Sequence, residues 1–223
     1  MGRPELLISA AELETKLGSA GLVVLDVRGA EEYATSHIPG AVRVDVGRWR
    51  RKHSVLPSDD APYWAAEVGG LGVGAGSSVV VYGDRLTDTC RVWWTLKYLG
   101  VEKAAVLDGG WAAWATDKRP TTSEVSTARG VPFEPRFEPE RLAHTDDVKN
   151  WLKKSHVALI DARSTGEYSG QVVRGARGGC IPGATHLEWK ELVDTSGRFR
   201  SAADIRGIFM ERGIGTQKIL VPY

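Results

Sequence analysis

The sequence has few cysteines, no excess of charge of one sign and no long apolar run. Only Cys90 and Cys180 are cysteine among the 223 residues, which excludes a disulfide framework and favours a reducing compartment. The 29 basic and 28 acidic side chains leave a net charge of +1, so no electrostatic feature favours a nucleic acid or a membrane as partner. Because no segment has the pattern of a bilayer span or a secretory signal, we expect a cytoplasmic protein.

The sequence also lacks the patterns that bind metal ions or dinucleotides. Its five histidines are scattered and show no metal-ligand spacing. The glycine-rich stretch "GGLGVGAG" (Gly69–Gly76) is similar to a dinucleotide fingerprint, but it precedes a predicted strand, whereas such a fingerprint follows one. We therefore expect neither a metal nor another cofactor.

What the sequence does contain is a long internal repeat. "VVLDVRGAEEY" (Val23–Tyr33) matches "ALIDARSTGEY" (Ala158–Tyr168), and "HIPGA" later matches "CIPGA". The stretch "GVGAGSSVVVY", which ends at Tyr82, aligns without a gap with "GIGTQKILVPY", which ends at Tyr223. Since there are only two long copies, the pattern predicts a tandem duplication and not a solenoid.

Apolar periodicity alternates between strand and helix patterns along both copies. The run "LVVLDV" is typical of a strand buried on both faces, and strands separated by helices favour a parallel α/β sheet. Ser9 and Glu12 form a capping box, and Asp108 is expected to cap a later helix. The expected strands cover residues 22–27, 42–46, 79–82, 104–107, 157–161 and 219–221, and the expected helices cover residues 9–17, 31–36, 63–68, 88–99, 111–115 and 146–153.

Both copies resemble the rhodanese superfamily. "DVRGAEEYATSHIPGA" in the first copy, and "DARSTGEY" with "CIPGA" in the second, are similar to its signature stretches, and Arg91–Trp114 resembles the end of the first domain in tandem sulfurtransferases. The resemblance implies an α/β fold with two rhodanese-like domains, each a parallel sheet flanked by helices, the second incomplete. We expect them at residues 5–116 and 143–223, with a linker over residues 117–142.

The resemblance also implies an inactive first domain and a catalytic second one. Such enzymes move a sulfane sulfur from a small anionic donor, thiosulfate or 3-mercaptopyruvate, to a thiol or cyanide acceptor through an enzyme persulfide. Their cysteine begins a loop at a strand end, where converging N–H groups stabilise a thiolate. The alternative is a non-catalytic rhodanese-like binding or regulatory module.

The position of the nucleophile distinguishes the two copies. In the first copy Gly83 stands at the nucleophile position. In the second copy the nucleophile would directly follow Tyr223. Residues 83–116 have no counterpart in the second copy, so we expect a C-terminally truncated domain with no catalytic residue in the chain, which we predict to be inactive. Two explanations stay open: an ordinary fragment, or an in-frame selenocysteine codon, UGA, that is read as a stop.

Eight additional residues precede "CIPGA" in the second copy, and Arg174 and Arg177 lie in this segment. The resemblance implies that arginines here contact the anionic donor, and a guanidinium fork suits a pair of oxygens; the alternative is a solvated basic loop. Cys180 is a weaker candidate nucleophile. The alternative interpretation, which we favour, is a partly buried loop cysteine. Cys90 is expected to be a packed residue of a helix.

The Asp-x-Arg pairs, Asp26 with Arg28 and Asp161 with Arg163, are present in both copies. Because the copy without a nucleophile keeps its pair, we expect the two pairs to support the structure and not to take part in the chemistry.

Overall fold

The computed structural model describes residues 6–54, 59–152, 154–215 and 218–223. The chain divides into two compact units, Met1–Arg141 and Leu142–Tyr223. Each unit is built on a parallel sheet flanked by helices, which confirms the expected α/β class.

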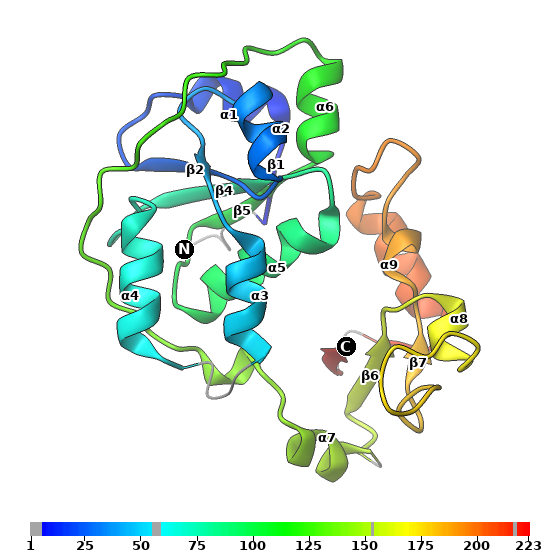
Figure 1. Ribbon diagram of the computed structural model, residues 1–223. Helices are drawn as coiled ribbons and strands as arrows, with labels where there is room; N and C mark the ends of the chain where they lie inside the picture. The colour runs from blue at the N-terminus through cyan, green and yellow to red at the C-terminus, as the bar shows by residue number, and fades with distance from the viewer. Residues whose placement is uncertain (1–5, 55–58, 153, 216–217) are drawn as a thin grey trace. The chain divides into compact units, whose positions relative to one another are not determined.

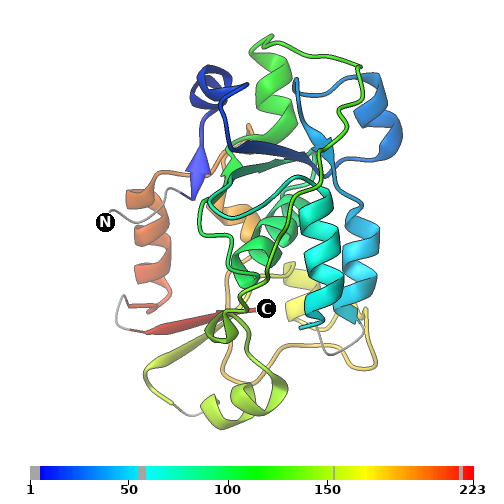
Figure 2. The ribbon, with the colours of Figure 1, turned by 90° about the vertical axis from the view of Figure 1, so that its left-hand side faces the viewer.

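The first unit has, among its described residues, a five-stranded parallel sheet in the order β1-β5-β4-β2-β3. Helices lie on both faces of this sheet (Figures 1 and 2). The strands are β1 (Leu7–Ile8), β2 (Leu22–Asp26), β3 (Val42–Arg43), β4 (Ser78–Tyr82) and β5 (Ala104–Leu107). The helical segments are α1 (Ala10–Lys16), α2 (Ala30–Thr35), α3 (Val46–Ser54), α4 (Ala61–Gly70), α5 (Leu86–Tyr98), α6 (Gly110–Thr116) and the 3-10 turn η1 (Pro139–Arg141).

The core of the first unit lies between its sheet and the two helix layers. On one face, Leu13 of α1 and Trp114 of α6 are fully buried in one apolar cluster with Val80 of β4. On the helices α3 and α4, Trp49 and Trp64 are also buried, and their rings meet edge to face at 5.2 Å. Because both faces are covered, the central strands carry near-continuous apolar runs.

The second unit has a three-stranded parallel sheet in the order β7-β6-β8 in the part of the chain described. Its central strand β6 is buried throughout, because alternate side chains pack into two apolar clusters. The strands are β6 (Val157–Asp161), β7 (Thr185–His186) and β8 (Ile219–Pro222), and the helical segments are α7 (Thr145–Trp151), α8 (Thr165–Tyr168), η2 (Trp189–Leu192) and α9 (Ala202–Glu211).

The order β7-β6-β8 repeats the order β3-β2-β4 of the first unit. Asp26 at the end of β2 is in register with Tyr82 of β4. In the second unit Ile160 is in register with Pro222, so that the next residues, Asp161 and Tyr223, occupy the equivalent places. The structural repeat therefore has the same alignment as the sequence repeat.

Two local predictions are wrong. The strand expected over residues 42–46 ends at Arg43, and Val46 begins α3; alternation of valines favoured a strand, but the Asp45 carboxylate accepts the Arg48 N–H at 2.9 Å and caps a helix turn. Asp108 does not cap α6: the N-cap is Gly109, whose φ of 78° is left-handed and suits glycine.

The segment expected to be a linker is attached to the first unit along its length. Thr122 exchanges backbone hydrogen bonds with His37, at 2.8 and 2.9 Å. The Val131 N–H donates to the Gly69 carbonyl at 3.0 Å. The boundary between the two compact units accordingly lies after Arg141. The functional domain limits, residues 5–116 and 143–223, stay a prediction.

Candidate functional site

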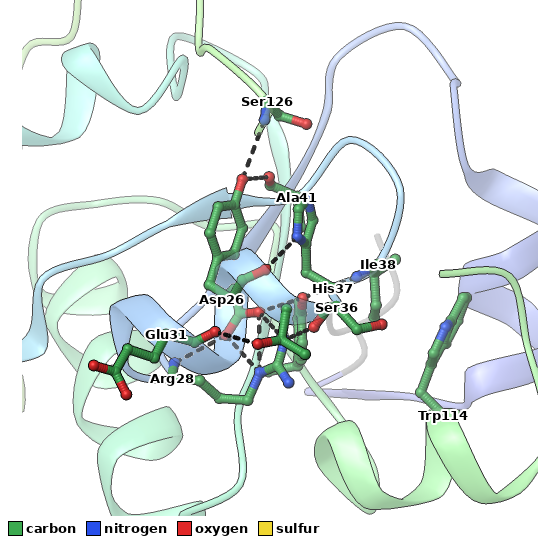
Figure 3. A network of polar contacts seen from close by, with 12 residues as sticks. Asp26, Arg28, Glu31, Ser36, His37, Ile38, Ala41, Trp114 and Ser126 are labelled. Atoms are coloured by element: carbon green, nitrogen blue, oxygen red, sulfur yellow. Dashed lines mark hydrogen bonds and ion pairs between the residues drawn. The ribbon is translucent and has the colours of Figure 1, made fainter. Parts of the chain in front are cut away.

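A buried cluster of Asp26, Arg28 and Tyr82 lies at the carboxyl edge of the first sheet. Parallel strands bring their carboxyl ends to one edge, where α/β proteins usually have their sites. The Arg28 guanidinium donates twice to the Asp26 carboxylate, at 3.0 Å through Nε and 2.6 Å through Nη2. It also donates to the Ser36 carbonyl at 2.7 Å, and the Tyr82 hydroxyl donates to Asp26 Oδ2 at 2.6 Å. Figure 3 shows Asp26, Arg28 and Ser36 of this network.

Burial and the contacts to Asp26 together set the charges of this cluster. Asp26 is fully buried and Arg28 is 7% exposed. Burial acts to lower the pKa of Arg28, but its bonds to Asp26 outweigh burial and raise it. Burial, together with the Asp26 charge, raises the pKa of Tyr82 well above its usual value. The cluster thus holds one ion pair and a neutral phenol, which suits a structural role.

The position after Tyr82 has no room for a side chain. A Cβ atom on Gly83 would lie 2.5 Å from Val27 Cγ2 and 3.1 Å from Thr89 Oγ1. The Gly83 carbonyl accepts the Trp111 N–H at 3.1 Å, and the Trp111 ring lies 3.9 Å from the Arg28 guanidinium. The residue at the nucleophile position of the first copy is therefore held by packing on two sides.

The same cluster recurs in the second unit as Asp161, Arg163 and Tyr223. Arg163 donates to the Asp161 carboxylate through Nε at 2.9 Å and through Nη2 at 2.5 Å, and to the Gly179 carbonyl at 2.9 Å. The Tyr223 hydroxyl accepts the Ile181 N–H at 2.9 Å, as the Tyr82 hydroxyl does in the first unit. Asp161 and Arg163 therefore have the structural contacts predicted for both pairs.

The end of β8 is fixed in the same way as the end of β4. The Ala162 N–H donates to the Tyr223 carbonyl at 3.0 Å, and the Val27 N–H donates to the Tyr82 carbonyl at 2.9 Å. Burial acts to raise the pKa of Asp161, but the bonds from Arg163 outweigh it and hold that pKa below its usual range. Tyr223 therefore lies at the carboxyl edge of the second sheet, beside the ion pair of Asp161 and Arg163.

The loop of residues 170–179, here called the arginine loop, carries Arg174 and Arg177. Both side chains are exposed. Arg174 is not free: its Nε donates at 2.8 Å to Glu167 of α8. Arg177 has no ion pair with any described residue. The structure thus places both arginines in one exposed loop and pairs Arg174 with a carboxylate that the sequence pattern does not predict.

The two cysteines differ in environment. Cys90 lies in α5, and burial raises the pKa of its thiol to about 11. Cys180 is exposed, which corrects its reading as partly buried. Its counterpart His37 is fully buried, because the segment after α6 covers it with the Thr122 and Glu124 carbonyls; no described segment gives Cys180 the same cover.

This difference predicts selective thiol chemistry. At pH 8 we expect Cys180 to react with Ellman's reagent about 100-fold faster than Cys90, because a thiol with a raised pKa has little thiolate. Stopped-flow absorbance would measure the two phases. Cys180→Ser should remove the fast phase and Cys90→Ser only the slow one; a fast phase that survives Cys180→Ser would contradict the assignment.

The sequence marks Tyr82 and Tyr223 as strand ends, but it did not predict that they join the Asp–Arg clusters. Tyr82 lies 56 residues from Asp26, so no local spacing connects them. A signal was available, since both copies of the repeat end their strand in tyrosine, "VVVY" and "LVPY".

Among the described residues, no group of three or more histidine, cysteine, aspartate or glutamate side chains is placed to hold a metal.

The fold and the paired clusters define a protein with two related parallel α/β units. Residues 9–117 match the rhodanese-like domain family. The thiosulfate sulfurtransferase of Azotobacter vinelandii is 34% identical over 221 residues, covering 98% of this chain and 82% of the relative. The 3-mercaptopyruvate sulfurtransferase of Escherichia coli (strain K12) is 30% identical over 224 residues, covering 98% and 77%. The chain belongs to the rhodanese family.

A solved structure agrees with this relationship. The crystal structure of SseA from Escherichia coli, described as a 3-mercaptopyruvate sulfotransferase, superposes with a TM-score of 0.82 at 27% identity, covering 98% of this chain and 87% of that one. In the part of our structure that is described, no helix combines the length and apolar character needed to cross a bilayer.

Proposed function

We propose that this protein is a sulfurtransferase that moves a sulfane sulfur from thiosulfate or 3-mercaptopyruvate to a thiol or cyanide acceptor. The observation that carries the proposal is the end of β8. The Tyr223 carbonyl is held by Ala162 as the Tyr82 carbonyl is held by Val27, so the residue after Tyr223 would stand at the carboxyl edge of the sheet. The sulfurtransferase names of the relatives support the same reaction class.

The nucleophile is proposed to occupy the position directly after Tyr223, as cysteine or, if the codon is UGA, as selenocysteine. Its thiolate or selenolate would attack the sulfur that is transferred, which in thiosulfate is the outer sulfur. With thiosulfate the S–S bond breaks and sulfite leaves with the electron pair, which leaves the transferred sulfur on the enzyme. Attack of cyanide on that sulfur releases thiocyanate and restores the anion.

The donor is proposed to meet the arginine loop, through Arg174 and Arg177. Arg163 holds the end of this loop through the Gly179 carbonyl, and it also lies against the Tyr223 ring, 5.4 Å from its centroid. The loop and the end of β8 are thereby anchored on one side chain. The first unit is proposed to be non-catalytic, because Gly83 is closed in by Val27.

The test compares the 223-residue chain with the gene product extended by the codons after Tyr223. We expect the extended product to catalyse thiosulfate:cyanide or mercaptopyruvate:thiol transfer and the 223-residue chain to show no appreciable turnover. Substituting the residue after Tyr223 by serine should lower kcat at least about 1,000-fold, whereas Cys180→Ser should leave it unchanged. Sequencing the DNA past Tyr223 identifies the codon.

Two results would contradict the proposal. Turnover of the 223-residue chain that is lost in Cys180→Ser would move the nucleophile to the exposed loop cysteine. An extended product that folds but transfers no sulfur from either donor would favour the non-catalytic binding or regulatory module.

A further inference from the structure

The arginine loop is built as a closed unit and not as a free surface loop. Its Val172 N–H donates to the Gly166 carbonyl of α8 at 2.9 Å. A Cβ atom on Gly170 would lie 3.0 Å from the Gly179 nitrogen, so the two ends of the loop approach each other closely. Because the base of the loop is fixed on α8 and by Arg163, its charged side chains are presented from a defined support.

Glu167 has a carboxylate that is held in place from two sides. One oxygen, Oε2, accepts the Ser164 hydroxyl at 2.7 Å and its N–H at 3.3 Å, in a capping box at the start of α8. The other oxygen, Oε1, accepts Arg174 Nε at 2.8 Å. The Ser164 hydroxyl bond, with Arg174, lowers the pKa of Glu167. The carboxylate is therefore ionised at neutral pH and engaged by both partners.

Charge compensation leaves a small net charge at this edge. Arg163 is compensated by Asp161, and Arg174 by Glu167. Arg177 is the arginine of the loop without an ion pair among the residues described. A donor that binds Arg174 therefore comes close to a fixed negative charge as well as to a positive one.

We propose that Glu167 sets the charge preference of the donor site, so that a singly charged, carboxylate-bearing sulfur donor is favoured over a dianion such as thiosulfate. This inference rests on the proposed sulfur-transfer function of the same edge. In a water-exposed site, a carboxylate about 6 Å away lowers the binding constant of a singly charged anion about threefold. It lowers the binding constant of a doubly charged anion about tenfold. Removing the Glu167 charge should therefore help a dianion more than a monoanion.

The experiment titrates ¹⁵N-labelled 223-residue chain with thiosulfate, the dianion, and with pyruvate, a monoanionic carboxylate. The readout is the Nε–H resonance of Arg174, assigned with Arg174→Lys. In Glu167→Gln, which keeps an oxygen for Ser164, we expect the Kd of thiosulfate to fall about tenfold and that of pyruvate about threefold. The change in preference should fade in 0.5 M salt, where such interactions are screened beyond about 4 Å.

Two control variants separate charge from structure. Ser164→Ala removes the cap but keeps the Glu167 charge, and Asp204→Asn removes one charge from the serine-capped start of α9. Both should leave the thiosulfate-to-pyruvate ratio of Kd unchanged. Three results would overturn the inference. Glu167→Gln could leave the ratio of Kd unchanged, or it could weaken the binding of both anions. Alternatively, neither anion could perturb the Arg174 resonance in either protein.

A failure of the charge preference can be distinguished from a failure of the sulfurtransferase proposal. Sulfur transfer by the extended product with an unchanged ratio in Glu167→Gln would reject the charge preference alone. A changed ratio without any sulfur transfer would leave the anion preference standing and reject the sulfurtransferase proposal.

Discussion

Asp26→Ala is expected to lower the free energy of unfolding of the first unit by about 3–5 kcal/mol, because it leaves the Arg28 charge buried without its partner. Arg28 is 7% exposed, so water cannot replace the hydrogen bonds to the carboxylate that its guanidinium loses. The measurement is urea denaturation followed by tryptophan fluorescence, which reports mainly the first unit, since six of the eight tryptophans lie at positions 49 to 114.

The internal repeat supplies a matched variant. Asp161→Ala removes the equivalent carboxylate of the second unit, but the Arg163 side chain is 34% exposed and can gain water as a partner. We expect a smaller loss there, about 1–2 kcal/mol, measured by hydrogen exchange of β6. Adding Arg28→Met to Asp26→Ala should recover part of the first loss; a double variant no more stable than the single one would contradict this account.

Backbone amides of β8 and β6 are expected to exchange with solvent about 30-fold faster than those of β4 and β2. The strand β4 is paired on both edges, by β2 and β5, whereas β8 pairs only with β6 among the described strands. Leu220 of β8 is 45% exposed, and its counterpart Val79 of β4 is 1% exposed. Incomplete burial of such side chains costs about 2 kcal/mol of local stability. Hydrogen exchange with mass spectrometry measures both strand pairs in one experiment.

The same pair of residues gives the control. Val79→Ser should destabilise the first unit by about 2–3 kcal/mol, because it replaces two buried methyl groups with a buried hydroxyl. Leu220→Ser should change the stability of the second unit by no more than about 0.5 kcal/mol. Equal protection of the two sheets, or equal cost of the two substitutions, would show that β8 is as well packed as β4.

Strongly periodic segments were predicted well, and elements set by single side chains were not. The strand over residues 157–161 has the predicted bounds, and the capping box of Ser9 and Glu12 begins α1 as expected. The prediction failed at Val46, where one aspartate side chain turned an alternating pattern into a helix. Periodicity reports the average environment of a segment, whereas a cap is one hydrogen bond.

The candidate site shows the same division. Arg174 and Arg177 were found from the repeat and the resemblance, but Glu167, the partner of Arg174, was not. Glu167 is seven residues from Arg174 and lies in a different element, so no helical or strand spacing predicts their contact. The exposure of Cys180 likewise depends on which segments cover it, and the identity of a residue does not contain that information.

The sequence by itself determined the duplication, the alternation of strands and helices, and the Asp-x-Arg pair that recurs in each copy. These features are local, or are visible as similarity between two stretches of the chain. Only the tertiary structure decided that Tyr82 and Tyr223 complete the two clusters, and that Glu167 compensates Arg174. The physical reason is that a parallel sheet brings the carboxyl ends of strands distant in sequence to one edge, where loops and side chains then meet.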